Sequence, residues 1–184
     1  MFSFLVTLRE GFEIALIVAI VLGYLARTGN RASFPRVWGG VVGDDGPENL
    51  IIGEGDPDGE SFLALQRYAL QLRERGIFLA VCSKNDDAQA RRPFRELPDM
   101  ALREEHISVF QANWSDKPSN LEAIAGALNI GLDALVFIDD NPAERAHVRA
   151  ALPLVAVPEM PDEPAHFVST IAAAGYFEAV SFSA

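Results

Sequence analysis

Two adjacent carboxylates, Asp139 and Asp140, are the residues whose types and spacing best suit metal chemistry in this chain. They directly follow the apolar run 135–138, and Asn141 and Pro142 come next, at the start of a helical pattern. If 135–138 is a buried strand of an open α/β sheet, both carboxylates lie at its carboxyl end, where such sheets bind ligands. An oxygen-seeking cation such as Mg²⁺ would neutralise them. The alternative is structural: one carboxylate caps the following helix and the other is solvated.

Ser83 is a candidate phosphate ligand. It ends a second apolar run, 77–82, in the segment VCSKND, with Lys84 and Asn85 beside it. A hydroxyl and backbone N–H groups at the end of a strand that leads into a helix can cradle a phosphate. The alternative is an ordinary helix N-cap. Cys82 lies on the apolar run itself, and we interpret it as a core residue.

Lys117 is the third candidate, in the segment NWSDKPSN ahead of a helical pattern over 118–128. Lys84 is the other lysine in a chain that otherwise uses arginine. A lysine is a compact point charge that suits phosphate and carboxylate groups. The alternative is a solvated residue just before a helix that starts with proline.

The elements that must position these residues alternate between strands and helices. The apolar runs 77–82, 135–138 and 154–157 have strand length and no polar face, which is typical of strands covered on both sides. Helical spacing and end signals predict helices over 59–75, 86–97, 118–128, 142–151 and 166–174, and residues 41–59 suggest a hairpin or flap. Strands that alternate with helices predict a doubly wound parallel sheet of the α/β class.

Composition narrows the possible functions. The net charge of −11 and the absence of a basic stripe argue against nucleic acid as a partner. A hydrophobic content of 49% is enough for a true core. The single cysteine allows neither an internal disulfide nor a zinc cluster, and it fits a reducing compartment.

Residues 1–27 form a separate hydrophobic segment. As a helix, residues 2–25 would be about 36 Å long, enough to cross a bilayer. The uninterrupted apolar run from Ile14 to Leu25 is shorter, so a buried helix is the alternative. Arginines follow this segment and predict that the globular part faces the cytoplasm. Residues 28–37 read as a linker, and 38–184 as the globular domain.

Taken together, the loops around Ser83, Lys117 and Asp139 resemble those of the haloacid dehalogenase superfamily, most closely its FkbH-like branch, subfamily IIIC. The resemblance covers residues 38–178 and rests on the segments WGGVVGDDG, GESFLALQRY, VCSKND, FQANWSDKPSN, NIGLDALVFIDDNPAER and AGYFE. It implies that Ser83, Lys117 and Asn85 bind phosphate. It implies Mg²⁺ as cofactor, bound by Asp139 with Asp140 beside it.

The family resemblance also suggests partners and activity. Its members are phosphatases and related enzymes that act on phosphorylated three-carbon acids, and several load a glyceryl unit onto an acyl carrier protein in polyketide assembly. Their first motif, Asp-x-Asp-x-Thr, ends a strand just before the segment that starts at Trp38. Here that place holds ASFPRV. We therefore expect a sheet that lacks the nucleophile strand, and catalysis impaired by loss of the attacking aspartate and of the general acid.

The first 30 residues resemble the first membrane helix of the high-affinity iron permease family through LREGFEIALIV at 8–18. That resemblance implies Glu10 and Glu13, one helical turn apart, as iron ligands. Two glutamates do not complete an iron shell. Three readings follow: an impaired phosphatase or glyceryl-transfer domain, a membrane-tethered module that binds phosphate or a carrier protein, and an iron-permease fragment fused to a passenger domain.

Overall fold

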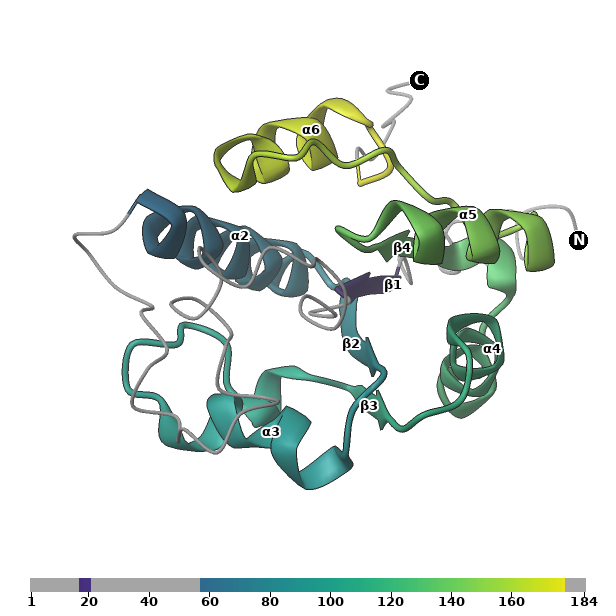
Figure 1. The fold of residues 1–184 in the computed structure, drawn as a ribbon, viewed down its shortest axis with the longest axis horizontal. Coiled ribbons are helices and arrows are strands. Elements are labelled where there is room, and N and C mark those ends of the chain that lie inside the picture. Colours follow the sequence, from purple (N-terminus) through teal and green to yellow (C-terminus); the bar gives the residue numbers. More distant parts are fainter. Residues whose placement is uncertain (1–16, 21–56, 178–184) are drawn as a thin grey trace, which may run out of the picture.

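The computed structural model describes residues 17–20 and 57–177, and a parallel sheet in the order β3-β2-β1-β4 lies at its centre (Figure 1). The strands are β1 (Ile17–Ile20), β2 (Phe78–Ser83), β3 (Val109–Ala112) and β4 (Leu135–Ile138). The helices are α2 (Pro57–Glu74), α3 (Asp87–Glu96), α4 (Lys117–Leu128), α5 (Pro142–Ala151) and α6 (Phe167–Ala173), with short 3-10 turns η3 (Glu104–His106), η4 (Leu132–Ala134) and η5 (Pro164–His166).

Each face of the sheet has its own hydrophobic core, because successive side chains of a strand point to opposite faces. Leu79 and Val81 of β2 pack in a cluster with residues of α2, α3 and α6. Ala80 and Cys82 pack in a second cluster with residues of α4 and α5. Helices therefore cover both faces, as the sequence predicts for a doubly wound α/β fold.

Ile17–Ile20 corrects two expectations from the sequence. This segment was expected in a hydrophobic helix over residues 1–27, but it forms the central strand β1. Its residues pair in parallel with β2 on one side and with β4 on the other, where Ile20 lies opposite Ile138. The sheet thus has a strand in the place expected to be empty. A short apolar run rich in β-branched residues fits a buried strand as well as a helix, so periodicity does not separate the two.

Two further strand predictions also change. Val109–Ala112 is a strand that the sequence analysis missed, because it is a four-residue edge strand without a continuous apolar run. Residues 154–157 were expected to form a strand, but they contribute only one bridge, between Ala156 and Val136. Pro158 follows immediately and has no N–H with which to extend a ladder.

Polar residues at their ends fix the helices that border the site. Asp116 caps α4 by accepting a hydrogen bond from the Ser119 N–H (2.8 Å), and α4 ends at Asn129 in the left-handed region (φ 55°). Asn141 caps α5 by accepting from the Ala143 N–H (2.9 Å). The predicted helices 118–128 and 142–151 are confirmed to within one residue.

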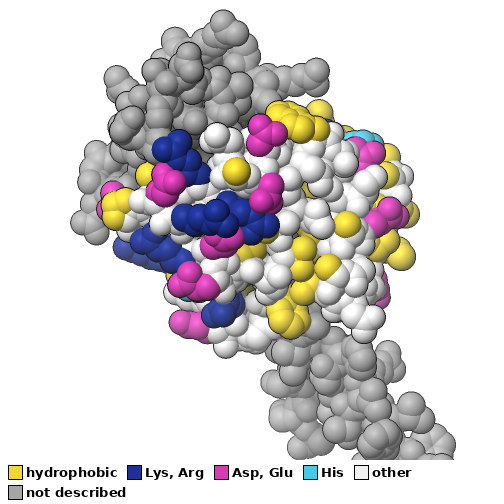
Figure 2. Space-filling view, turned by 90° about the horizontal axis from the view of Figure 1, so that it is seen from below, with side chains coloured by type: hydrophobic (Ala, Val, Ile, Leu, Met, Phe, Trp, Pro, Cys, Tyr) yellow, Lys and Arg dark blue, Asp and Glu magenta, His cyan; other side chains and the backbone are white. Residues whose placement is uncertain are grey.

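Ion pairs cover the outer face of α3, where basic and acidic side chains lie side by side (Figure 2). Arg91 binds Asp87 (2.7 Å) and Glu104 (2.6 Å), and its guanidinium lies 4.3 Å from the ring centroid of Phe110. Arg95 also donates to Glu104 (2.9 Å). These contacts tie α3 to the turn η3 and to the edge strand β3.

Several predictions concern residues that the structure does not describe. The following lie outside the described residues: the rest of the expected N-terminal helix with Glu10 and Glu13, the linker 28–37, and the expected flap up to residue 56. Within the described ranges, no helix has the length and apolar character needed to cross a membrane.

Candidate functional site

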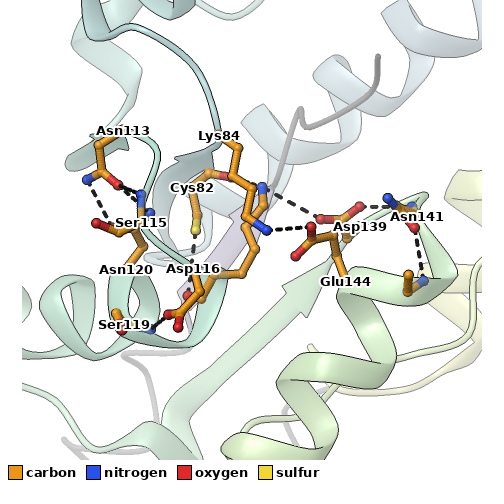
Figure 3. Close-up of polar contacts among 12 residues, drawn as sticks. Cys82, Lys84, Asn113, Ser115, Asp116, Ser119, Asn120, Asp139, Asn141 and Glu144 are labelled. Carbon is orange, nitrogen blue, oxygen red and sulfur yellow. Dashed lines mark hydrogen bonds and ion pairs between the residues drawn. The ribbon is translucent and has the colours of Figure 1, made fainter. Parts of the chain in front are cut away.

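The candidate site lies where β2 and β4 end, on the two sides of β1 (Figure 3). Ser83 is the last residue of β2, and Asp139 and Asp140 follow β4. Lys117 is the first residue of α4, which follows β3. Because parallel strands end at the same edge of a sheet, the three predicted loops meet at one edge.

Lys117 is buried, with 2% of its side chain exposed, which excludes the solvated alternative. Its Nζ donates to the carbonyl of Cys82 (2.6 Å) and lies 3.7 Å from Oδ2 of Asp139. The Leu79 and Ser83 carbonyls accept from β3-side N–H groups. Since carbonyls alternate in direction along a strand, the Cys82 carbonyl faces the β1 side, two residues past Ala80, the last β2 residue paired with β1. The ammonium group therefore joins β2 to β4 across the carboxyl end of β1.

Asp139 is almost fully buried, and its two oxygens have different environments. Oδ1 accepts from the Asn141 N–H (2.8 Å), which closes the turn after β4. Oδ2 is buried, and the described residues offer it no hydrogen bond. Burial raises the pKa of this carboxyl group, and the nearby Lys117 ammonium opposes the rise. Asp139 does not cap α5, since Asn141 does, so Oδ2 remains available for a ligand.

Asp140 is partly buried beside Asp139. Burial, and then the charge of Asp139, raise the pKa of its carboxyl group to about 7. Each negative charge therefore makes ionisation of the other carboxyl group less favourable, and a bound cation would relieve this repulsion.

Glu144 and Lys84 form a second connection across the site, which the sequence analysis missed. The Lys84 Nζ donates to Oε1 of Glu144 (2.7 Å), joining the loop after β2 to the first turn of α5. Oε2 of Glu144 is buried without a hydrogen bond from the described residues. Its charge is close enough to contribute to the raised pKa of Asp139. The sequence offered one signal for Glu144: it lies two residues after Pro142, in the helix turn next to the strand ends.

The remaining predicted residues lie at the edge of this constellation. Ser83 is buried and does not cap α3, whose N-cap is Asp86. Asn85 is partly exposed, and its Oδ1 accepts from the Asp86 N–H (2.8 Å). Asp86 makes no capping bond with its side chain and accepts from Nε1 of the exposed Trp114 (3.1 Å).

Cys82 is confirmed as a core residue. Its side chain is fully buried, and burial raises the pKa of the thiol to about 11. It is therefore protonated at neutral pH and is no nucleophile.

The two carboxylates fit a magnesium ion that takes its remaining ligands from substrate and water. Within the described residues, no cluster of three or more histidine, cysteine or acidic side chains could enclose a metal. Mg²⁺ commonly takes one or two carboxylates and completes its octahedron with water and phosphate oxygens. Oδ2 of Asp139, which accepts no hydrogen bond from the described residues, and the adjacent carboxylate of Asp140 match that donor set.

Comparison with solved structures shows that this chain is similar to a phosphatase domain. A crystal structure of the N-terminal part of a Bacteroides fragilis protein, containing a phosphatase domain and complexed with Mg, is similar to 97% of this chain at 40% identity and a TM-score of 0.78. The chain spans 44% of that structure's length. No family model matches the chain, and neither does any curated protein. The chain therefore has the α/β fold of that phosphatase domain.

Proposed function

We propose that this chain is a phosphatase-type domain that binds a phosphorylated small acid together with Mg²⁺ and lacks the residues for rapid turnover. The observation that carries the proposal is the buried Oδ2 of Asp139, which accepts no hydrogen bond from the described residues and lies 3.7 Å from the Lys117 ammonium. A carboxylate and a lysine held there by burial are suited to a metal-bound phosphate. The similar Bacteroides phosphatase domain supports this assignment.

Each residue has a defined role in the proposal. Asp139 and Asp140 would hold the metal, which supplies positive charge to the phosphate oxygens. Lys117 lies between β2 and β4 and would bind a phosphate oxygen while it keeps Asp139 ionised. Ser83, at the end of β2, would donate its hydroxyl to the phosphate.

The covalent step lacks its nucleophile. Ile20, the last residue of β1, pairs with Ile138, which directly precedes Asp139. In the sequence Ile20 is followed by Val21, Leu22 and Gly23, none of which can attack phosphorus or protonate a leaving group. By its resemblance to the haloacid dehalogenase superfamily, the chain would need an Asp-x-Asp pair directly after this strand.

The pairing of Ile17–Ile20 also bears on the competing readings. A segment hydrogen-bonded between β2 and β4 belongs to the α/β domain, which weighs against a membrane helix or an iron-permease fragment. An acyl carrier protein stays a predicted partner.

The experiment measures Mg²⁺-dependent hydrolysis of a generic phosphate monoester. We expect the wild-type chain to be as inactive as Asp139→Ala. A variant with Val21→Asp and Gly23→Asp should hydrolyse the ester at least about 100-fold faster, because it restores the nucleophile and general acid that the resemblance requires directly after this strand. The matched control carries Val21→Asn and Gly23→Asn and should stay inactive. Fast hydrolysis by the wild-type chain that disappears in Asp139→Ala would show that another residue is the nucleophile.

A further inference from the structure

Arg145 is a buried arginine on α5 that holds the turn carrying the two carboxylates. Only 6% of its side chain is exposed. Its Nη1 donates to the backbone carbonyls of both Asp139 and Asp140, each at 2.8 Å. A planar guanidinium that binds two successive carbonyls fixes the direction of the peptide planes between them. The Cα atoms of Asp139 and Asp140, from which the two side chains extend, lie in these peptide planes.

The position of this contact explains why an arginine is needed. The Leu135 carbonyl accepts from the Ala156 N–H (2.9 Å), so odd-numbered carbonyls of β4 point away from β1 toward residue 156. In this register the next N–H, that of residue 158, would reach the Phe137 carbonyl, but Pro158 has none. The pairing therefore ends before it reaches the Asp139 carbonyl, which continues the same series. Arg145 supplies the donor that a neighbouring strand would otherwise provide.

A second layer of contacts orients Arg145 itself. Its Nη2 donates to Oε2 of Glu159 (3.1 Å), and Arg149, one helical turn later, pairs with the other oxygen of Glu159. Arg149 also donates to the Val157 carbonyl (2.8 Å). Glu159 is 71% exposed, so it anchors the guanidinium from outside the core.

We propose that Arg145 is a positioning residue for the carboxylate pair: its bonds to the Asp139 and Asp140 carbonyls hold Oδ2 of Asp139 toward Lys117 and thereby set the Mg²⁺ affinity of the pair. The magnesium part rests on the proposed function. Groups that orient metal ligands without touching the metal commonly change metal affinity 10- to 100-fold when they are removed.

The test compares Arg145→Gln with Arg149→Gln. Both changes remove an arginine that binds Glu159, but only Arg145 contacts the carboxylate turn. Two quantities are measured. The first is the hydrogen-exchange rate of the Asn141 amide, whose N–H donates to Oδ1 of Asp139 and which can be followed without any metal. The second is the Mg²⁺ affinity, measured by calorimetric titration. Thermal unfolding of each variant serves as the control for general loss of structure.

We expect Arg145→Gln to exchange the Asn141 amide about 10-fold faster and to bind Mg²⁺ about 10-fold more weakly, whereas Arg149→Gln changes each by less than about threefold. Equal effects of the two variants would overturn the proposal. If the wild-type chain binds no Mg²⁺, the proposed function fails, and the amide exchange alone decides whether Arg145 orders the turn. If Arg145→Gln does not fold, Glu159→Gln replaces it. That exposed change should weaken Mg²⁺ binding by about threefold, and no change would overturn the proposal.

Discussion

Replacing Lys117 by methionine should destabilise the protein strongly and in a pH-dependent way. Methionine keeps the length and apolar character of the lysine stem but removes the ammonium group. Lys117 is the cation 3.7 Å from the buried Oδ2 of Asp139, which has no hydrogen bond within the described residues. Its removal leaves a buried carboxylate without a countercharge.

The size of the effect follows from the distance and from burial. For unit charges 3.7 Å apart, an effective dielectric constant of about 20 gives an attraction of about 4 kcal/mol. Removing one partner of a buried pair typically costs about 3–5 kcal/mol. Asp139 can avoid part of this cost by binding a proton, because burial already raises its pKa and loss of Lys117 raises it further.

The sign of the pH dependence follows from this rise. A carboxyl group whose pKa is higher in the folded state than in the unfolded chain costs no stability below the unfolded value of about 4, and stability falls as pH rises from there through the folded pKa. We therefore expect Lys117→Met to lower the free energy of unfolding by about 3–5 kcal/mol at pH 8 and by about 1–2 kcal/mol at pH 5, where loss of the bond to the Cys82 carbonyl dominates.

Urea unfolding followed by circular dichroism, without divalent cations, measures both values. Lys84→Met is the matched control, because its ion pair with Glu144 is partly exposed and should be worth less than about 1 kcal/mol. A loss in Lys117→Met that is equal at the two pH values, or no larger than in Lys84→Met, would refute this electrostatic reasoning.

Three further predictions concern stability. The pKa of Asp140 is raised to about 7, so its ionisation costs stability as pH rises from about 4 to 7. In urea unfolding without Mg²⁺, Asp140→Asn should therefore be more stable than wild type by about 1–3 kcal/mol at pH 8 and equally stable at pH 4. Gln66→Leu should lose about 2–4 kcal/mol in urea, because the Gln66 Oε1 accepts two backbone N–H groups at residues 101–102 (2.8 and 3.1 Å), and Gln66→Glu should lose less. Two arginines lower the pKa of Glu104 to about 2, so the stability that its charge contributes is present above about pH 4 and is lost as pH falls through 2. Glu104→Gln should therefore lower the melting temperature at pH 7, and this difference from wild type should shrink in 1 M salt.

The sequence located the site better than it located the sheet. Asp139 and Lys117 each follow a strand or begin the next helix, and in a parallel sheet such residues meet at one edge whatever the detailed register. That rule placed them correctly. Spacing places Glu144 and Arg145 near the strand ends, but their contacts with Lys84 and with two carbonyls depend on side-chain direction in three dimensions.

The first strand was missed for a physical reason. Ile17–Ile20 lies within a longer apolar stretch, and apolar content alone fits a strand, a core helix or a membrane helix. Pairing with β2 and β4 decides among these, and pairing is a long-range property of the chain. Val109–Ala112 was missed because an edge strand is covered less and lacks a continuous apolar run.

Calorimetric titration of inorganic phosphate into the protein, with and without Mg²⁺, tests the central claim most directly. If Asp139 and Asp140 hold the metal and Lys117 holds the phosphate, phosphate should bind only when Mg²⁺ is present, and Asp139→Asn should abolish that binding while the fold is retained. Phosphate binding that is independent of Mg²⁺, or that persists in Asp139→Asn, would contradict the account.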